Sequence, residues 1–177
     1  YQKKLKSGSV KDIYFIRPAH NFIAMLDKKV LDITLLGLKS QNSTLGHRFY
    51  SKNKIKISSA KEYVKKLKSK GKVIVSFAER KKEIVSQIEN SSKNLIPILP
   101  EELINEICSI CEWPKIYPSS FDKEFLSLPK ECLILTMQKN QKYVPLKNKN
   151  GNLTNKYLIV SNIAPEDSSS ILLGNKR

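Results

Sequence analysis

The stretch from Trp113 to Pro145 constrains the fold through closely spaced breaks in the backbone pattern. Proline follows Trp113 and Leu128, where it interrupts regular hydrogen bonding because it lacks the amide donor and restricts the residue before it. The pattern around these breaks predicts a strand at 115–117, a short helix from Asp122 and a second helix over 130–139. So many transitions indicate a rigid segment of a folded domain rather than one ordinary surface helix.

The N-terminal part of the chain predicts short strands. Two apolar runs, 22–26 and 30–36, flank the polar residues 27–29, which predicts a hairpin with a short loop. Because both runs are largely apolar, we expect the two strands to be buried on both faces. Short apolar or alternating runs predict further strands at 12–16, 55–57 and 73–75.

Helix signals dominate residues 58–111. Ser58 or Ser59 suits the start of a helix that ends at Gly71. Ser76 and Glu79 have the spacing of a capping box, which predicts a second helix to about Ser92, and Pro100 suits the first turn of a third. The apolar side chains expected to face inward from these helices are Tyr63, Val64, Leu67, Phe77, Ile84, Val85, Ile88, Leu103, Ile107, Ile110 and Cys111.

The sequence Asn150-Gly151 lies between apolar runs at 143–146 and 157–161 and predicts a hairpin, because this pair tolerates positive φ. Strands and helices therefore mix along the chain without a strict strand–helix–strand repeat. The sequence predicts the α+β (mixed α/β) class, with a mixed sheet and flanking helices.

The length of 177 residues is sufficient for one well-buried domain. We expect a linker or lead-in over 1–11, a single mixed α/β domain over 12–163, and the start of a helix connecting to a next domain over 164–177. The chain begins with Tyr1 rather than Met, and its last residues resemble a helix cut short. We therefore expect it to be an internal fragment of a longer polypeptide.

Positive charge dominates the composition, with 32 Lys and Arg against 16 Asp and Glu and a formal net charge of +16. Such an excess favours polyanions, either nucleic acid or an anionic membrane. The alternative is compositional drift from Arg to Lys in an AT-rich genome, since few of the basic residues are Arg and the chain is rich in Asn and Ile. No apolar run has the length of a membrane span and no signal peptide is visible, so we expect a soluble, cytoplasmic protein without a membrane partner.

Residues with metal-binding or catalytic potential do not form a recognisable motif. Cys108 and Cys111 have the spacing Cys-x-x-Cys, but they fall in a predicted amphipathic helix without a second pair, whereas structural zinc needs four ligands. We interpret them as buried small hydrophobic residues. His20 and His47 lie in different segments, and no glycine-rich phosphate-binding motif occurs. We therefore expect no catalytic residue, metal or cofactor in this chain.

Two segments are candidates for contact with RNA. The loop Gly46–Phe49 combines a flexible backbone, two donors in His47 and Arg48, and an aromatic ring, which suits phosphate or base contact. The alternative is that Phe49 anchors the loop while His47 caps a carbonyl. Gln141 and Lys142 supply polar groups after the predicted 130–139 helix, although the helix dipole alone favours lysine there.

Short motifs distributed along nearly the whole chain identify a family. They are Arg17-Pro18-Ala19-His20, Leu36-Gly37-Leu38, Gly46-His47-Arg48-Phe49, Phe77-Ala78-Glu79-Arg80-Lys81, Glu112-Trp113-Pro114, Ser120-Phe121-Asp122, Phe125-Leu126, Leu128-Pro129, Thr136-Met137, Gln141-Lys142-Tyr143 and Ser161-Asn162-Ile163. Together and in this order they resemble the beta subunit of the bacterial two-subunit glycyl-tRNA synthetases. The departures are small: Val144 stands where the family usually has Phe, and Lys176 where Glu is more usual.

The resemblance implies a ligase of two alpha and two beta subunits that charges tRNA(Gly) with glycine at the expense of ATP. It implies that the alpha subunit holds ATP, with Mg, and glycine, while the beta subunit contributes mainly tRNA recognition and assembly. The candidates for tRNA binding are then His47, Arg48, Gln141 and Lys142. A His-Asp domain follows this segment in the family, and the segment itself is similar to the editing-domain fold of the phenylalanyl-tRNA synthetase beta subunit.

That likeness raises a second hypothesis, a vestigial editing domain that hydrolyses mischarged tRNA. Editing by a second pocket has little use here, because glycine is the smallest amino acid and the synthetic pocket excludes larger ones sterically. The sequence also shows no obvious pair of nucleophile and base. A structural scaffold at the subunit interface is the third hypothesis. We expect tRNA contact and subunit assembly, with no catalysis by the fragment alone.

Overall fold

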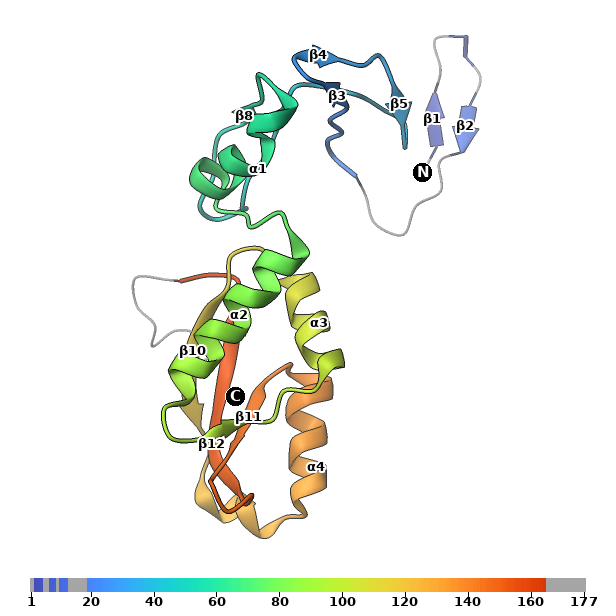
Figure 1. Ribbon diagram of the computed structural model, residues 1–177. Helices are drawn as coiled ribbons and strands as arrows, with labels where there is room; N and C mark the ends of the chain where they lie inside the picture. The colour runs from blue at the N-terminus through green and yellow to red at the C-terminus, as the bar shows by residue number, and fades with distance from the viewer. Residues whose placement is uncertain (1, 5–6, 9, 13–18, 165–177) are drawn as a thin grey trace. The chain divides into compact units, whose positions relative to one another are not determined.

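The computed structural model describes residues 2–4, 7–8, 10–12 and 19–164 (Figure 1). The chain divides into two compact units, unit 1 over residues 1–73 and unit 2 over residues 74–177. The single domain expected over 12–163 includes parts of both units and stays a prediction. The strand expected at 12–16 and the helix expected at 164–177 lie almost entirely outside the described residues.

Unit 1 contains short antiparallel hairpins. The pairs are β1 (Gln2–Lys4) with β2 (Val10–Asp12), β3 (Met25–Leu26) with β4 (Lys29–Val30), β5 (Thr34–Leu35) with β6 (Leu38–Lys39), and β7 (Ser43–Thr44) with β8 (Ile55–Lys56). The hairpin predicted around 27–29 is confirmed, with Asp27 at a φ of 49° in its turn. The expected burial is wrong, because pairs of two-residue strands form no layer that could cover Leu26, Ile33 and Leu35, which are exposed.

A helical segment closes unit 1 and confirms the helix predicted to end at Gly71. It consists of the 3-10 turn η1 (Ala60–Glu62), α1 (Tyr63–Lys66) and the π-helical turn η2 (Leu67–Gly71). Leu67 is buried as expected and belongs to the core of the unit with Ile55 and Ile57, whereas Val64 is exposed. Lys72 follows in the left-handed conformation, at a φ of 53°, and ends the segment.

Unit 2 is built on a four-stranded antiparallel sheet with the strand order β10-β12-β11-β9 (Figure 1). The strands are β9 (Ile96–Pro97), β10 (Lys115–Ser120), β11 (Val144–Lys147) and β12 (Leu153–Ser161). The predicted hairpin of β11 and β12 is confirmed, with Gly151 at a φ of 83°. The mixed α/β class is confirmed, but all pairs of named strands in the described part of the chain are antiparallel, so the expected mixed sheet is absent there. A tight hairpin joins only antiparallel strands, and β12 continues this arrangement to β10.

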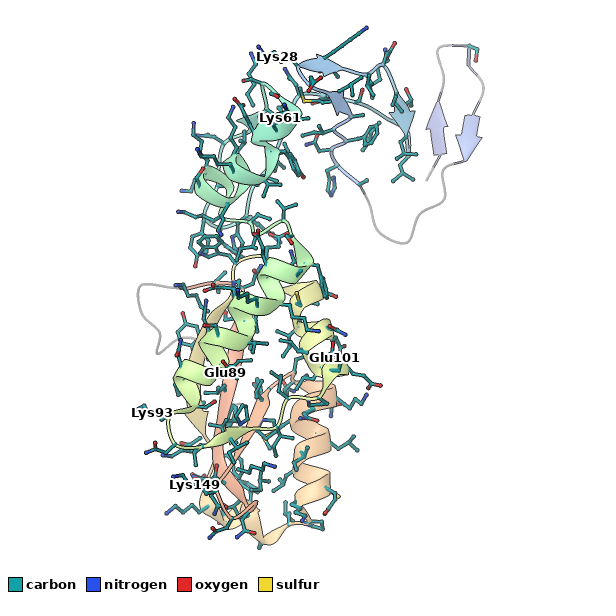
Figure 2. All side chains as sticks on the ribbon, in the orientation of Figure 1. Lys28, Lys61, Glu89, Lys93, Glu101 and Lys149 are labelled. Carbon is teal, nitrogen blue, oxygen red and sulfur yellow. The ribbon has the colours of Figure 1, made fainter. Side chains whose placement is uncertain are left out.

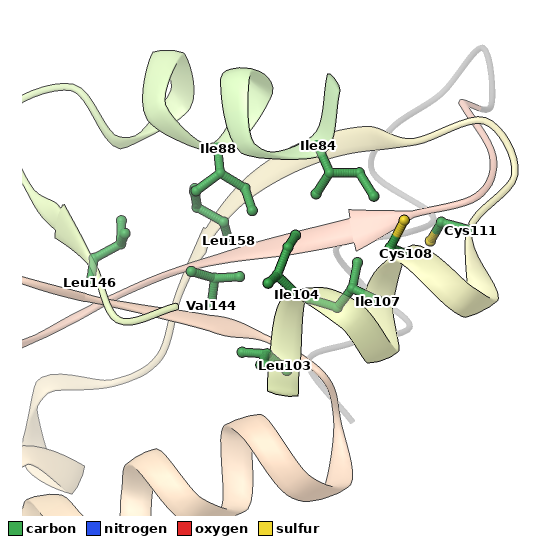
Figure 3. Packing of buried hydrophobic residues seen from close by; sticks show 10 residues of the cluster. All are labelled: Ile84, Ile88, Leu103, Ile104, Ile107, Cys108, Cys111, Val144, Leu146 and Leu158. Carbon is green, nitrogen blue, oxygen red and sulfur yellow. The ribbon is translucent and has the colours of Figure 1, made fainter. Parts of the chain in front are cut away.

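Both faces of the sheet in unit 2 carry apolar clusters. On one face α2 (Phe77–Ser92) and α3 (Glu101–Ile110) pack against the strands, with Ile84 and Ile88 pointing toward Leu158 of β12 (Figure 3). On the other face Tyr157 and Ile159 join a second cluster. Successive residues of β12 thus serve opposite faces, as the alternation of a strand requires.

The punctuated stretch from Trp113 to Pro145 forms the elements that its sequence predicts. Strand β10 starts at Lys115, the 3-10 turn η3 (Lys123–Ser127) follows Asp122, and α4 (Lys130–Leu135) follows Pro129. The π-helical turn η4 (Thr136–Asn140) extends α4 to the predicted end.

Helix α2 starts as its capping box predicts, since the Ser76 hydroxyl accepts a hydrogen bond from the Glu79 amide at 3.3 Å. The strand predicted at 73–75 is wrong. The Val73 amide donates to the Leu67 carbonyl at 3.1 Å, and the Ile74 amide to the Glu112 carbonyl at 3.0 Å, so no ladder forms. Phe77 and Ile110, expected inward, are exposed.

The packing of Ile88 predicts a large effect of its truncation. We expect Ile88→Ala to lower the free energy of unfolding of unit 2 by about 2–5 kcal/mol, because a fully buried side chain leaves a cavity. Urea unfolding followed by the fluorescence of Trp113, the chain's one Trp, measures this change. The control is Ile110→Ala. Because the Ile110 side chain is 55% exposed, this substitution should change the free energy of unfolding by no more than about 0.5 kcal/mol. Equal effects of both substitutions would contradict the packing described.

Candidate nucleic-acid interface

The loop Leu45–Ser51 in unit 1 is organised around the buried side chain of His47, which is 0% exposed. The His47 amide donates to the Gly71 carbonyl at 2.7 Å, and the His47 carbonyl accepts from the amides of Tyr50 and Ser51 at 3.2 and 2.9 Å. The imidazole Nδ1 accepts from the Phe49 amide at 3.2 Å, and the ring stacks on Tyr50 with centroids 4.7 Å apart. His47 therefore fixes the backbone of the loop from inside.

This geometry differs from both interpretations of the loop. In the alternative interpretation Phe49 anchors the loop, but its ring is 61% exposed, and His47 is the buried residue. Because His47 is enclosed, its side chain is out of reach of a ligand in solvent. Its Nε2 atom has no hydrogen-bond partner among the described residues.

Gly46 allows the loop to approach the end of the helical segment closely. A Cβ atom at Gly46 would lie 2.5 Å from the Cα and 2.6 Å from the carbonyl oxygen of Gly71. Both are backbone atoms, which cannot move aside as the end of a flexible side chain can. The tight contact thus requires glycine at position 46.

The exposed side of the loop presents Arg48, Phe49 and Tyr50. The Arg48 guanidinium carbon lies 5.9 Å from the centre of the Phe49 ring, within the range of a cation–π contact. Proteins that bind single-stranded nucleic acid without sequence preference combine cationic side chains, which contact phosphates, with aromatic rings, which stack on bases.

A cavity of about 460 Å³ lies beside this loop. Tyr50 lines it together with five lysines, and we call this the lysine cavity; the lysines are Lys52, Lys54, Lys56, Lys66 and Lys70. The first three lie two residues apart, the last of them within β8, and Lys66 and Lys70 are four residues apart in the helical segment. Sequence reasoning missed this cavity, although the alternation and the four-residue spacing were visible signals.

The charge of the lysine cavity is only partly balanced. Lys66 Nζ lies 2.7 Å from Glu62, and the hydrogen bond from Lys66 lowers the pKa of that carboxyl group. Within the described residues no carboxylate lies within ion-pair distance of the other four lysines. The lysine cavity therefore forms a positively charged surface suited to an anionic ligand, and the loop that contributes Tyr50 and Ser51 to it also carries the exposed Arg48.

Gln141 and Lys142, the other two candidates, belong to unit 2 and follow η4. Lys142 Nζ pairs with Glu106 at 2.7 Å and donates to the Lys139 carbonyl at 2.7 Å. This second contact is the interaction with a helix C-terminus that the dipole favours. Lys142 is thus engaged within unit 2, while Gln141 is exposed.

The two cysteines of the Cys-x-x-Cys sequence are buried in the core of unit 2, as predicted. Burial raises the pKa of the Cys111 thiol to about 11, and the neighbouring Cys108 adds to the shift. Among the residues that the structure describes, no group of three or more His, Cys, Asp and Glu side chains could hold a metal ion. In the same residues, no helix is both long and apolar enough to span a membrane.

Comparison with known proteins gives the same family along the whole chain. The family model described as glycyl-tRNA synthetase beta subunit matches residues 1–177. The chain belongs to the glycyl-tRNA synthetase beta subunit family. This confirms the resemblance drawn from the short motifs of the sequence.

Individual members of the glycyl-tRNA synthetase beta subunit family agree with that assignment. The chain is 46% identical over 166 residues to the glycine–tRNA ligase beta subunit of Ralstonia nicotianae, 44% over 165 residues to that of Neisseria meningitidis, and 45% over 170 residues to that of a Janthinobacterium species. These alignments cover 94%, 92% and 93% of this chain. The chain spans about a quarter of the length of these curated relatives, 24% in each case.

The contact of Gly46 with Gly71 predicts that Gly46→Ala disrupts the loop. We expect it to lower the stability of unit 1 by about 3 kcal/mol, because the added methyl group meets backbone atoms. Hydrogen exchange at the Tyr50 and Ser51 amides, which donate to His47, should then become faster. The control is Gly71→Ala, whose Cβ meets movable ends of Leu67 and Ile55 at 3.0 and 3.1 Å and should cost about 1 kcal/mol. A larger effect at Gly71 would contradict this account.

The cysteine environments predict selective thiol labelling. We expect an aromatic disulfide reagent at pH 8 to modify the exposed Cys132 rapidly and to leave Cys108 and Cys111 unmodified until the protein is denatured. The thiolate is the reactive form, and a pKa of about 11 keeps Cys111 protonated at pH 8. The absorbance of the released thiol counts the reacting groups. Cys132→Ser should abolish the rapid phase, and more than one rapid thiol in the unsubstituted chain would be inconsistent with the buried core.

Proposed function

We propose that the chain serves glycyl-tRNA synthesis as part of a glycine–tRNA ligase beta subunit, and that unit 1 contacts tRNA through the lysine cavity and Arg48. Membership of the family supports the first part of this proposal. The second part rests on the lysine cavity, in which four lysines lack a carboxylate partner among the described residues. Transfer RNA supplies a dense array of phosphates that such a surface attracts.

The proposal narrows the candidates that the sequence suggested. Arg48 is exposed on the loop whose residues Tyr50 and Ser51 line the lysine cavity, so it serves as a direct contact in this proposal. His47 supports the loop from inside, where its hydrogen bonds orient the backbone of Phe49 and Tyr50. Gln141 is a candidate on unit 2 by its exposure alone, and Lys142 serves the packing of that unit.

The chemistry of aminoacylation belongs to a partner in this proposal. ATP with Mg and glycine are bound by an alpha subunit, and two alpha and two beta subunits form the complex in the cytoplasm. The role of this chain is to hold the tRNA while the partner activates glycine.

A scaffold at the subunit interface is the second candidate function, and one observation in unit 2 favours it. Large apolar side chains in and around η3 and α4 are exposed; they are Phe125, Leu126, Leu128 and Leu135. Such side chains suit a protein interface. The two functions are compatible, because tRNA contact is assigned to unit 1 and the apolar side chains belong to unit 2.

The editing hypothesis gains less support from the chain. The most reactive residue types in the core of unit 2, Cys108 and Cys111, are buried, and burial keeps Cys111 in its unreactive thiol form. The likeness to the editing domain of the phenylalanyl-tRNA synthetase beta subunit stays a prediction. Release of amino acid from mischarged tRNA by the full-length protein would support it.

The proposal predicts a salt-dependent contact with tRNA that depends on the lysine cavity. In the full-length protein, we expect replacement of Lys52, Lys54 and Lys56 by Gln to weaken tRNA binding. The slope of log K against log salt concentration should fall in magnitude by about one for each lysine that contacts a phosphate. Filter binding or fluorescence anisotropy with tRNA(Gly), repeated over a range of salt concentrations, measures this slope.

The matched control removes three exposed lysines from unit 2, namely Lys115, Lys123 and Lys149, the last of which lies in the turn between β11 and β12 (Figure 2). Both triple variants lose the same charge, so a general electrostatic effect lowers the slope equally in each. An equal fall in the slope for both triple variants would show that the lysine cavity is not a specific contact for tRNA. An unchanged slope in the unit 1 variant would favour the scaffold function.

A further inference from the structure

We infer that Phe49 stacks on an unpaired nucleotide of the bound RNA while the lysine cavity holds the neighbouring phosphates. This inference rests on the proposed tRNA contact and adds that the surface binds an unpaired part of the RNA. The ligand class is single-stranded RNA, as in a loop or a free end of a folded RNA. Two features carry this inference: Phe49 is an exposed aromatic ring on a fixed backbone, and it precedes Tyr50, which lines the lysine cavity.

Phe49 is exposed and yet firmly placed. Its ring is 61% exposed, but its amide donates to Nδ1 of the fully buried His47 at 3.2 Å. His47 is held in turn by the hydrogen bond from its own amide to Gly71 and by its stacking on Tyr50. A ring on a backbone fixed from inside loses little conformational freedom when a ligand binds, so more of the contact energy is available for affinity.

Arg48 places a cation beside the Phe49 ring, and we call these two side chains the stacking platform. Its guanidinium carbon is 5.9 Å from the centre of the Phe49 ring. An arginine over an aromatic ring supports base stacking in two ways, because the guanidinium plane itself stacks on bases and its charge attracts the phosphate. Arg48 and Phe49 together therefore offer a surface to the flat face of a base.

Tyr50 lies between the stacking platform and the lysines of the lysine cavity along the chain. It follows Phe49 in the chain, stacks on His47 and lines the cavity. Lys52, Lys54 and Lys56 come next along the chain and line the same cavity. The loop thus leads from an aromatic ring to a row of cations within a few residues, which is the arrangement that binds a base and the phosphates beside it.

A double-helical RNA cannot contact both Phe49 and the lysine cavity in this way. Paired bases are stacked on each other, and an A-form duplex offers proteins mainly its phosphates and sugar hydroxyl groups. A duplex would contact the lysines and leave Phe49 without a partner. A single strand supplies both, since every unpaired base has an aromatic face.

The test compares two RNA probes on the full-length protein. One is a fluorescein-labelled oligouridylate of eight nucleotides, and the other is an eight-base-pair RNA duplex. We expect Phe49→Leu to weaken binding of the single strand about tenfold, which corresponds to about 1.4 kcal/mol, and to change duplex binding by less than about twofold. Phe49→Tyr, which keeps an aromatic face, should bind the single strand as the unsubstituted protein does. The control Phe77→Leu removes an exposed ring from unit 2 that also has an arginine beside it, and should change neither affinity.

A second measurement reports stacking directly and does not depend on affinity. A 2-aminopurine base placed in the single strand should lose fluorescence on binding to the unsubstituted protein and to Phe49→Tyr, and lose less on binding to Phe49→Leu. Equal losses of affinity for both probes, or no loss for either, would overturn the stacking inference while leaving the lysine contact intact. If neither probe binds with salt dependence, the proposed tRNA contact fails as well. Phe49→Leu that retains RNA binding but loses a protein partner would assign the ring to protein docking instead.

Discussion

The candidate site in unit 1 depends on one backbone contact, the approach of Gly46 to Gly71. At position 46 a side chain would begin 2.5 Å from the Gly71 Cα, and the hydrogen bond from His47 to the Gly71 carbonyl fixes this distance. Lys70 precedes Gly71 and Lys52 lies shortly after the loop, so the same contact joins the two segments whose lysines share a cavity. The contact also encloses His47, and the enclosed ring then determines where Phe49 and Tyr50 lie. The contact of Gly46 with Gly71 thus determines the positions of the lysines, of Phe49 and of the loop backbone together.

Unit 2 is organised by a different principle, the alternation of side chains along β12. Leu158 packs under α2 and α3, whereas Tyr157 and Ile159 pack on the other face. Arg80 of unit 2 is also used differently from Arg48 of unit 1. Arg80 donates from Nε to the Cys108 carbonyl at 2.8 Å and from Nη1 to the Ile74 carbonyl at 2.6 Å, so it ties α2 to the end of α3 and to the start of the unit. Arg48 is exposed on its loop and remains available to a ligand.

Local signals in the sequence predicted the elements that depend on local physics. The capping box of α2, the Asn-Gly hairpin of β11 and β12, and the proline breaks around η3 and α4 act within a few residues, and all three occur. Tertiary contacts decided the rest. The β-branched run 73–75 forms no strand in the described part of the chain, because the Val73 and Ile74 amides donate to the carbonyls of Leu67 and Glu112. His47 is buried because Gly71, distant in sequence, meets its backbone. The lysine cavity combines two segments, so no single helix or strand contains it, and the sequence alone does not show that the two segments meet.

The excess of lysine has two explanations, and the energy of the charges alone does not separate them. Two exposed lysines about 8 Å apart repel by only about 0.5 kcal/mol in water, and salt reduces this further, so drift toward lysine is tolerated almost anywhere on a surface. Drift does not account for the neighbours of the lysines, however. Compositional drift does not place a glycine where only glycine fits, bury a histidine beneath a loop, or fix the backbone of an exposed phenylalanine. Because Tyr50 and Ser51 of the same loop line the lysine cavity, a nucleic-acid ligand explains these features together, whereas drift explains only the charge.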